Sequence, residues 1–148
     1  MQIREATTGD TQRILELMEE LMAPPGARPP DYSNEGATAR IHYSIVSPDA
    51  TVLLAEVDGV VVGLATLYVT FPAVRYGLRC WLEDLVTTSS MRSVGVGKTL
   101  LDAATDWARA RGCTHLMLDS GNARNDSHRF YLREGMDQHS ITFQRPLS

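Results

Sequence analysis

The residues at positions 92–98, Arg-Ser-Val-Gly-Val-Gly-Lys, combine two glycines with two cationic side chains. A strand-like run precedes this stretch, and a helical pattern of apolar residues follows it. A glycine-containing turn that opens a helix brings several backbone N–H groups together, and the helix dipole adds partial positive charge. Glycine also lets a ligand approach the backbone closely. The stretch therefore predicts a phosphate or pyrophosphate site at the start of a helix.

The same turn resembles part of a nucleotide-binding P-loop, because Gly97-Lys98-Thr99 matches the end of that motif. A P-loop follows the pattern GxxxxGK[ST], and its first glycine would have to stand at position 92. Arginine occupies that position, and the turn comes too late in the chain to leave room for the sheet of a nucleotide hydrolase. The sequence therefore argues against a P-loop protein.

A second group of residues lies downstream, with Ser-Gly-Asn at 120–122, Phe130-Tyr131 and Gly135-Met136. Together with the pattern Arg-x-x-Gly-x-Gly at 92–97, it resembles the two signatures of the GNAT superfamily of N-acetyltransferases. The chain departs from those signatures at Arg124, where the family usually has asparagine, and at Met136, where it usually has phenylalanine. The resemblance implies direct transfer of an acetyl group from acetyl-CoA, used as a co-substrate without a metal, to an amine. A catalytically silent acyl-CoA-binding or sensor module is the alternative.

Catalytic roles follow from this resemblance. Tyr131, at the second signature, would donate a hydrogen bond to the departing thiolate. Glu83 or Asp84 on the strand before the turn would be the base, and because side chains alternate across a strand we expect only one of them to face the substrate. Asp119 is a third, weaker candidate. The resemblance implies that the coenzyme is held by Leu85, Val86, Thr87, Arg92, Ser93, Val94, Gly95, Val96, Gly97, Lys98 and Thr99, and by Asn122 or Asn125.

The elements that must position these residues can be predicted from periodicity and turn residues. We expect strands over residues 2–6, 51–57, 60–69, 79–87, 115–119 and 139–145, and helices over 10–23, 34–46, 99–111 and 126–134. Asp58-Gly59 predicts a tight hairpin between the second and third strands. The strand at 79–87, the helix after it and the strand at 115–119 predict a parallel crossover. The expected fold class is α/β (α+β): a mixed central sheet with antiparallel amino-terminal strands, that one parallel unit and flanking helices, as in the GNAT fold.

Length and composition limit the remaining possibilities. The chain has 148 residues, which is one ordinary domain, and its net charge of -4 does not favour nucleic acid. Its two cysteines and four histidines have no metal-ligand spacing, and no apolar run is long enough to span a membrane. We therefore expect a single cytoplasmic domain that binds acetyl-CoA and an amine acceptor, with a homodimer possible through exposed strand edges. The acceptor would contact the 24–33 loop, the second helix and the loop at 71–77.

Overall fold

A five-stranded mixed sheet, in the order β1-β2-β3-β4-β5, organises the first part of the chain. The strands are β1 (Gln2–Glu5), β2 (Ala50–Val57), β3 (Val60–Val69), β4 (Cys80–Thr87) and β5 (Leu116–Met117). Neighbouring strands are antiparallel except β4 and β5, which are parallel. The predicted fold class and the parallel crossover are therefore confirmed, although β5 is shorter than the strand expected at 115–119.

The structure is a computed structural model that describes residues 1–148. The chain divides into two units, Met1–Leu118 and Asp119–Ser148. The first unit holds the sheet and three helices, and the second holds one helix and irregular chain. None of the helices has the length and apolar character needed to cross a bilayer.

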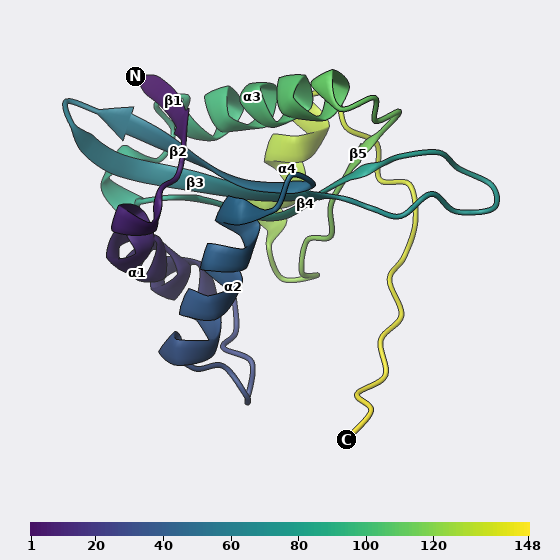
Figure 1. The fold of residues 1–148 in the computed structure, drawn as a ribbon, viewed down its shortest axis with the longest axis horizontal. Helices are drawn as coiled ribbons and strands as arrows, with labels where there is room; N and C mark the ends of the chain where they lie inside the picture. Colours follow the sequence, from purple (N-terminus) through teal and green to yellow (C-terminus); the bar gives the residue numbers. More distant parts are fainter. The chain divides into compact units, whose positions relative to one another are not determined.

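The helices α1 (Thr11–Met22) and α2 (Asn34–Val46) cover one face of the sheet, and α3 (Val96–Ala110) covers the other (Figure 1). Residues of α1 and α2 pack with alternate strand residues, among them Val52, Leu54, Leu64 and Val86. Leu64 and Ala65 are both fully buried because the two sheet faces are covered by different helices. The sheet is therefore the middle layer of three.

The β2–β3 hairpin turns at Asp58 and Gly59, as predicted. Both residues have positive φ angles, 50° and 78°, and Val57 pairs directly with Val60. Two consecutive residues at positive φ match the right-handed twist of the flanking strands, which explains why this dipeptide signals a hairpin so reliably.

The second unit contains helix α4 (Asn125–Arg133), close to the helix expected at 126–134. The strand expected at 139–145 is wrong, because residues 136–148 are irregular. Ile141 and Phe143, which lie within that range, are 77% and 90% exposed. An alternating pattern forms a strand only where a neighbouring strand offers pairing and one face is buried.

Candidate active site

The turn before α3 adopts the geometry of an anion site. The helix begins at Val96, three residues earlier than expected, so Gly97, Lys98 and Thr99 all lie in its first turn. Gly95 is the N-cap residue, in a left-handed conformation with φ 88°, and Ser93 also has a positive φ of 65°. The Thr99 backbone N–H and hydroxyl donate to the Gly95 carbonyl, at 3.0 and 2.9 Å. A residue of α3 itself therefore satisfies the Gly95 carbonyl.

The backbone N–H groups at this helix start are available to a ligand. No side chain caps α3, and the first N–H groups of any helix lack an intrahelical acceptor. Lys98 bonds Asp102 at 2.8 Å, and the exposed Arg92 donates only a long 3.5 Å contact to the Thr87 carbonyl. The neighbouring cations therefore reinforce a site whose main donors are backbone groups.

The strand that leads into this turn has an open edge. β5 pairs with β4 only at Cys80 and Trp81, so the remainder of β4, from Leu82 through the predicted coenzyme residues Leu85, Val86 and Thr87, has no strand partner on that side. Unpaired strand edges bind extended, amide-containing chains by adding them as a further strand. Such a chain could follow β4 toward the start of α3.

A β-bulge separates the two halves of β4 at the predicted carboxylates. Thr66 of β3 pairs with Asp84, whereas the next residue, Leu67, pairs with Leu82, so Glu83 is the extra residue. Strict alternation, from which we expected only one of Glu83 and Asp84 to face the substrate, therefore does not apply across this point. Residues opposite each other share a face, so Asp84 lies with Thr66 on the face that α1 and α2 cover.

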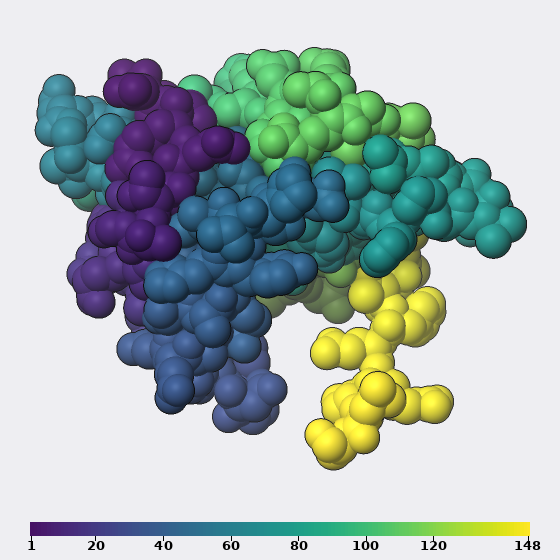
Figure 2. All heavy atoms as spheres, in the orientation of Figure 1, coloured from purple at the N-terminus to yellow at the C-terminus, as the bar shows by residue number.

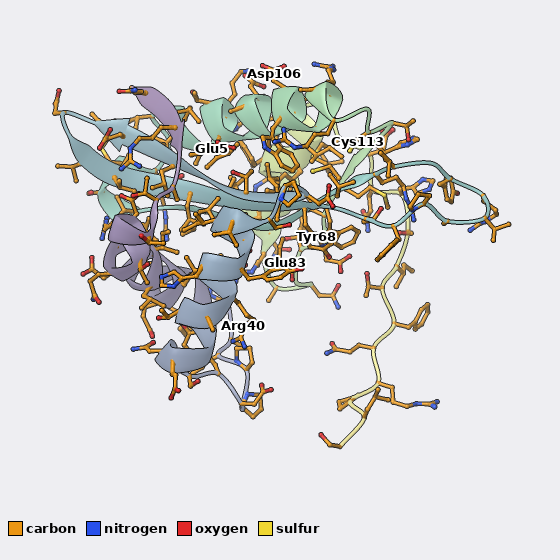
Figure 3. The ribbon with its side chains drawn as sticks, in the orientation of Figure 1. Glu5, Arg40, Tyr68, Glu83, Asp106 and Cys113 are labelled. Atoms are coloured by element: carbon orange, nitrogen blue, oxygen red, sulfur yellow. The ribbon has the colours of Figure 1, made fainter.

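The two carboxylates differ in their surroundings. Asp84 is half-buried and accepts a 2.6 Å hydrogen bond from the Thr66 hydroxyl. Glu83 is exposed, and Figure 3 shows it near Tyr68, on the α2 side of the sheet. Tyr68 is 41% exposed and alternates with Thr66 along β3. Where α1 and α2 do not cover it, this face of the sheet is therefore polar and partly exposed, and we call the surface formed by Thr66, Tyr68 and Asp84 the polar floor.

Gly63 of β3 allows β4 and the first turn of α3 to pack closely together. A Cβ atom at this glycine would lie 2.9 Å from the Val86 carbonyl oxygen, 3.0 Å from Val96 Cγ1 and 3.1 Å from Leu100 Cδ1. Only a residue without a side chain lets the first turn of α3 pack this closely on β3 and β4. Gly63 was not among the predicted site residues, although an isolated glycine within a strand pattern signals such a close approach.

The remaining predicted residues lie in the second unit. Burial raises the pKa of Tyr131 to about 12, with Arg124 opposing the shift, and the Phe130 ring packs edge-on at 5.3 Å. Asn125 is the first residue of α4, and Asn122 lies in the turn before it. Asp119 follows β5 and accepts a 2.6 Å hydrogen bond from Thr142.

Sequence reasoning missed the Thr66 hydroxyl, the bulge and Arg79. Thr66 is opposite Asp84 only because of the β3–β4 register, which no local pattern reveals. Arg79, just before β4, lies in a run of the sequence that carried no motif. Histidine, cysteine and acidic side chains do not gather anywhere into a group of three that could hold a metal ion.

Comparisons with known proteins identify the family of the chain. The model of the acetyltransferase (GNAT) family matches residues 14–136. The aminoalkylphosphonate N-acetyltransferase of Salmonella typhimurium (strain LT2) is 32% identical over 148 residues, covering 99% of this chain and 91% of that protein. The uncharacterized N-acetyltransferase YhdJ of Bacillus subtilis (strain 168) is 45% identical over 76 residues, which are 51% of this chain, and this match spans about half of YhdJ (54%).

A solved structure shares the fold. The aminoglycoside N-acetyltransferase AAC(6')-Iy, in complex with CoA, superposes with a TM-score of 0.85 over 99% of this chain and 95% of that one. The two sequences are 20% identical, so the likeness is one of fold.

Proposed function

Because the chain belongs to the acetyltransferase (GNAT) family, we propose that it transfers the acetyl group of acetyl-CoA directly to the primary amine of a small molecule, with residues 1–148 acting as one catalytic domain. One observation carries this proposal: β4 leaves β5 after Trp81, and its open edge runs from a carboxylate-bearing bulge to an uncapped helix start. Acetyl-CoA has the matching chemistry, with a thioester, two amides and a pyrophosphate in series.

The residues of β4 and α3 bind the coenzyme in this proposal. Backbone N–H groups of Val96, Gly97 and Lys98 donate hydrogen bonds to the pyrophosphate oxygens, with Arg92, Ser93, Val94, Gly95 and Thr99 shaping or flanking the turn. The backbone of Leu85, Val86 and Thr87 pairs with the amides of the pantetheine arm. Asn122 or Asn125 supplies a further hydrogen bond to that arm.

Asp84 is the proposed base. An alkylamine with an ordinary pKa of about 10.4 is mostly protonated near neutral pH, so a carboxylate, directly or through water, must accept a proton before the nitrogen can attack. The Thr66 hydroxyl orients Asp84, and the half-buried position limits its competition with solvent. Glu83, exposed beside the same bulge, is the second candidate.

Tyr131 completes the reaction. The amine nitrogen forms a bond to the acetyl carbon, and a backbone N–H at the β4 bulge stabilises the oxygen that becomes negative. The carbon–sulfur bond then breaks as the nitrogen loses its second proton, which balances the proton that the departing sulfur gains. The Tyr131 phenol donates a hydrogen bond or its proton to the sulfur. Its pKa of about 12 keeps it protonated at any working pH, so it remains a donor.

The small-molecule acceptor is supported by the relative that covers nearly the whole chain, whose name describes an aminoalkylphosphonate as its acceptor. The test is thiol release from acetyl-CoA with a panel of amines, beside thermal shifts with acetyl-CoA and with ATP. We expect stabilisation by acetyl-CoA alone and amine-dependent thiol release. Stabilisation without turnover on any amine would favour the sensor alternative, and no stabilisation would refute coenzyme binding.

The base is tested by comparing Asp84→Asn with Glu83→Gln. We expect Asp84→Asn to lower kcat about 100-fold or more, the usual contribution of a general base, and Glu83→Gln to lower it much less. The reverse order would assign the role to Glu83.

A further inference from the structure

We propose that Arg79 binds an anionic oxygen group of the acceptor, so that the preferred acceptor is an amine carrying a carboxylate or phosphoryl group at its other end. The inference rests on the proposed acetyl transfer and names the substrate class of the same site. It uses only residues of the first unit.

Arg79 is an arginine without an acidic partner. Its guanidinium lies over the Tyr76 ring at 4.5 Å, and one terminal nitrogen contacts the Met117 sulfur at 3.7 Å. Its Nε is buried and has no hydrogen-bond acceptor. By contrast, Arg4 and Arg13 each bond a carboxylate. Buried donors in native proteins are nearly always paired, so an orphaned guanidinium N–H calls for an acceptor that the chain itself does not supply.

The packing of Arg79 holds its donors in place. Stacking on Tyr76 and contact with Met117 restrict the orientation of the guanidinium. A planar, preoriented fork binds carboxylate and phosphoryl oxygens in pairs, which a flexible lysine cannot do. The aromatic ring and the thioether accept no strong hydrogen bond, so they support the cation without satisfying it.

Arg79 shares a sheet face with the proposed base. Tyr68 pairs with Trp81, and Thr66 pairs with Asp84 across the bulge, so Trp81 and Asp84 lie on one face. Arg79 precedes Trp81 by two residues and therefore lies on that face as well. Its contact with Met117, the β5 partner of Trp81, agrees with this. The polar floor thus has a carboxylate at one end and an unpaired cation at the other.

The spacing also predicts a length preference. Strand residues rise about 3.3 Å each, and the bulge shortens the path, so the backbones at Arg79 and Asp84 are separated by roughly 13–16 Å. The two side chains and the amine's own bonds bridge part of this distance. An acceptor with several carbons between its amine and its anion fits this separation better than the shortest member of a series.

The experiment measures kcat and KM for the ω-amino acids β-alanine, γ-aminobutyrate and ε-aminocaproate, and for alkylamines of equal chain length. The variants are Arg79→Gln, Arg79→Lys and the matched control Arg75→Gln, since Arg75 stacks on the same Tyr76 ring at 5.1 Å but is exposed. O-Phosphoethanolamine, beside ethanolamine, tests the phosphoryl form of the anion. Binding of the same acceptors to the CoA-bound protein is measured by calorimetry, which needs no turnover.

For the wild-type protein we expect a lower KM for amino acids than for matched alkylamines, with the largest difference at the longer chains. Arg79→Gln should raise KM for the anionic acceptors about 10- to 100-fold, the loss of a charge-assisted hydrogen bond. Its effect on the alkylamine KM and on CoA affinity should be much smaller. Arg79→Lys should recover part of the loss, and Arg75→Gln should cause none.

Equal losses for anionic and uncharged acceptors in Arg79→Gln would overturn the proposal and assign Arg79 a structural role. An equal effect of Arg75→Gln would also overturn it. Such a result would mean that any nearby positive charge attracts the anionic acceptor and that Arg79 does not bind it specifically. If no amine is acetylated but the anionic acceptors bind and lose affinity in Arg79→Gln, the acetyl transfer fails and the anion site stands. If anionic acceptors neither bind nor react while uncharged amines do, the anion site fails alone.

Discussion

Replacing Gly63 with alanine should damage the fold and coenzyme binding together. The added methyl carbon would lie 2.9 Å from the Val86 carbonyl oxygen and 3.0–3.1 Å from side-chain atoms of Val96 and Leu100. Val86 is a backbone neighbour within the sheet and cannot move alone, while Val96 and Leu100, almost fully buried, have little room to change rotamer. The first turn of α3 must therefore shift away from the sheet.

The expected size follows from two opposing effects. Overpacking a core costs about 1–3 kcal/mol, while replacing glycine with alanine restricts the unfolded chain and returns about 0.4–1 kcal/mol. The net loss lies between about 0 and 2.6 kcal/mol with a midpoint of about 1.3 kcal/mol, and for a chain of this length the midpoint lowers the melting temperature by roughly 4 °C. Because the shifted turn carries the proposed pyrophosphate donors, we also expect acetyl-CoA affinity to fall several-fold.

The assay combines thermal unfolding followed by circular dichroism with calorimetric titration of acetyl-CoA. Gly77→Ala is the matched control, since a Cβ there meets nothing within 4 Å, and it should leave both quantities unchanged. Adding Val96→Ala to Gly63→Ala removes one of the three clashes and should recover part of the affinity. A Gly63→Ala protein that melts as the wild type does and binds acetyl-CoA equally well would refute the reasoning.

Three further predictions concern the turn, the thiolate donor and a buried thiol. Gly97→Leu should abolish acetyl-CoA binding in a titration while keeping the fold, because leucine suits a helix but covers the N–H groups of its first turn; normal binding would disprove the pyrophosphate assignment. Tyr131→Phe should lower kcat by about tenfold or more with little change in acetyl-CoA affinity, measured by steady-state kinetics and titration, whereas equal losses would indicate packing. Burial raises the pKa of Cys80 to about 12 from an ordinary value of 9.0, so its contribution to stability is complete below about pH 9 and is lost as the pH rises toward 12, because only the unfolded chain ionises there. Denaturant titrations should therefore show stability falling by up to about 1.4 kcal/mol per pH unit above pH 9, and Cys80→Ala should flatten that fall.

The local patterns of the sequence predicted most of the elements. The hairpin at Asp58-Gly59 follows from two residues that tolerate positive φ, and α1 and α2 follow from the spacing of their apolar residues and from the residues that end them. The parallel pairing of β4 and β5 follows from a strand–helix–strand order. In each case the information lies within a few residues of the element.

The bulge, the Thr66 contact and the failed strand at 139–145 depend on distant partners. Glu83 becomes the extra residue only when β4 is aligned with β3, and Ile141 and Phe143 would become strand residues only with a pairing edge beside them. The start of α3 was predicted late because Gly97 is a poor helix residue that the tertiary structure nonetheless keeps helical. The cytoplasmic location, the homodimer and the residue roles stay predictions.

The loop between β3 and β4, with Arg79 at its base and Tyr76 near its far end, projects from the surface as the teal segment in Figure 2. Phe71 and Val74 in this loop are almost fully exposed and touch little else. Changes at these positions should affect stability little, so this part of the loop can vary without disturbing the proposed coenzyme residues.

Because of the bulge in β4, a small genetic change could alter the proposed activity while leaving the fold intact. Glu83 is one residue in excess of a regular strand, and the pairs on either side of it are already aligned with β3. Loss of the single codon for position 83 would give a regular strand with the sheet, the open edge and the turn before α3 preserved. The geometry around Asp84, the proposed base, would change, and the proposed coenzyme residues would not move. With these proposed roles, one in-frame deletion is a short evolutionary path from a catalyst to a protein that only binds acyl-CoA.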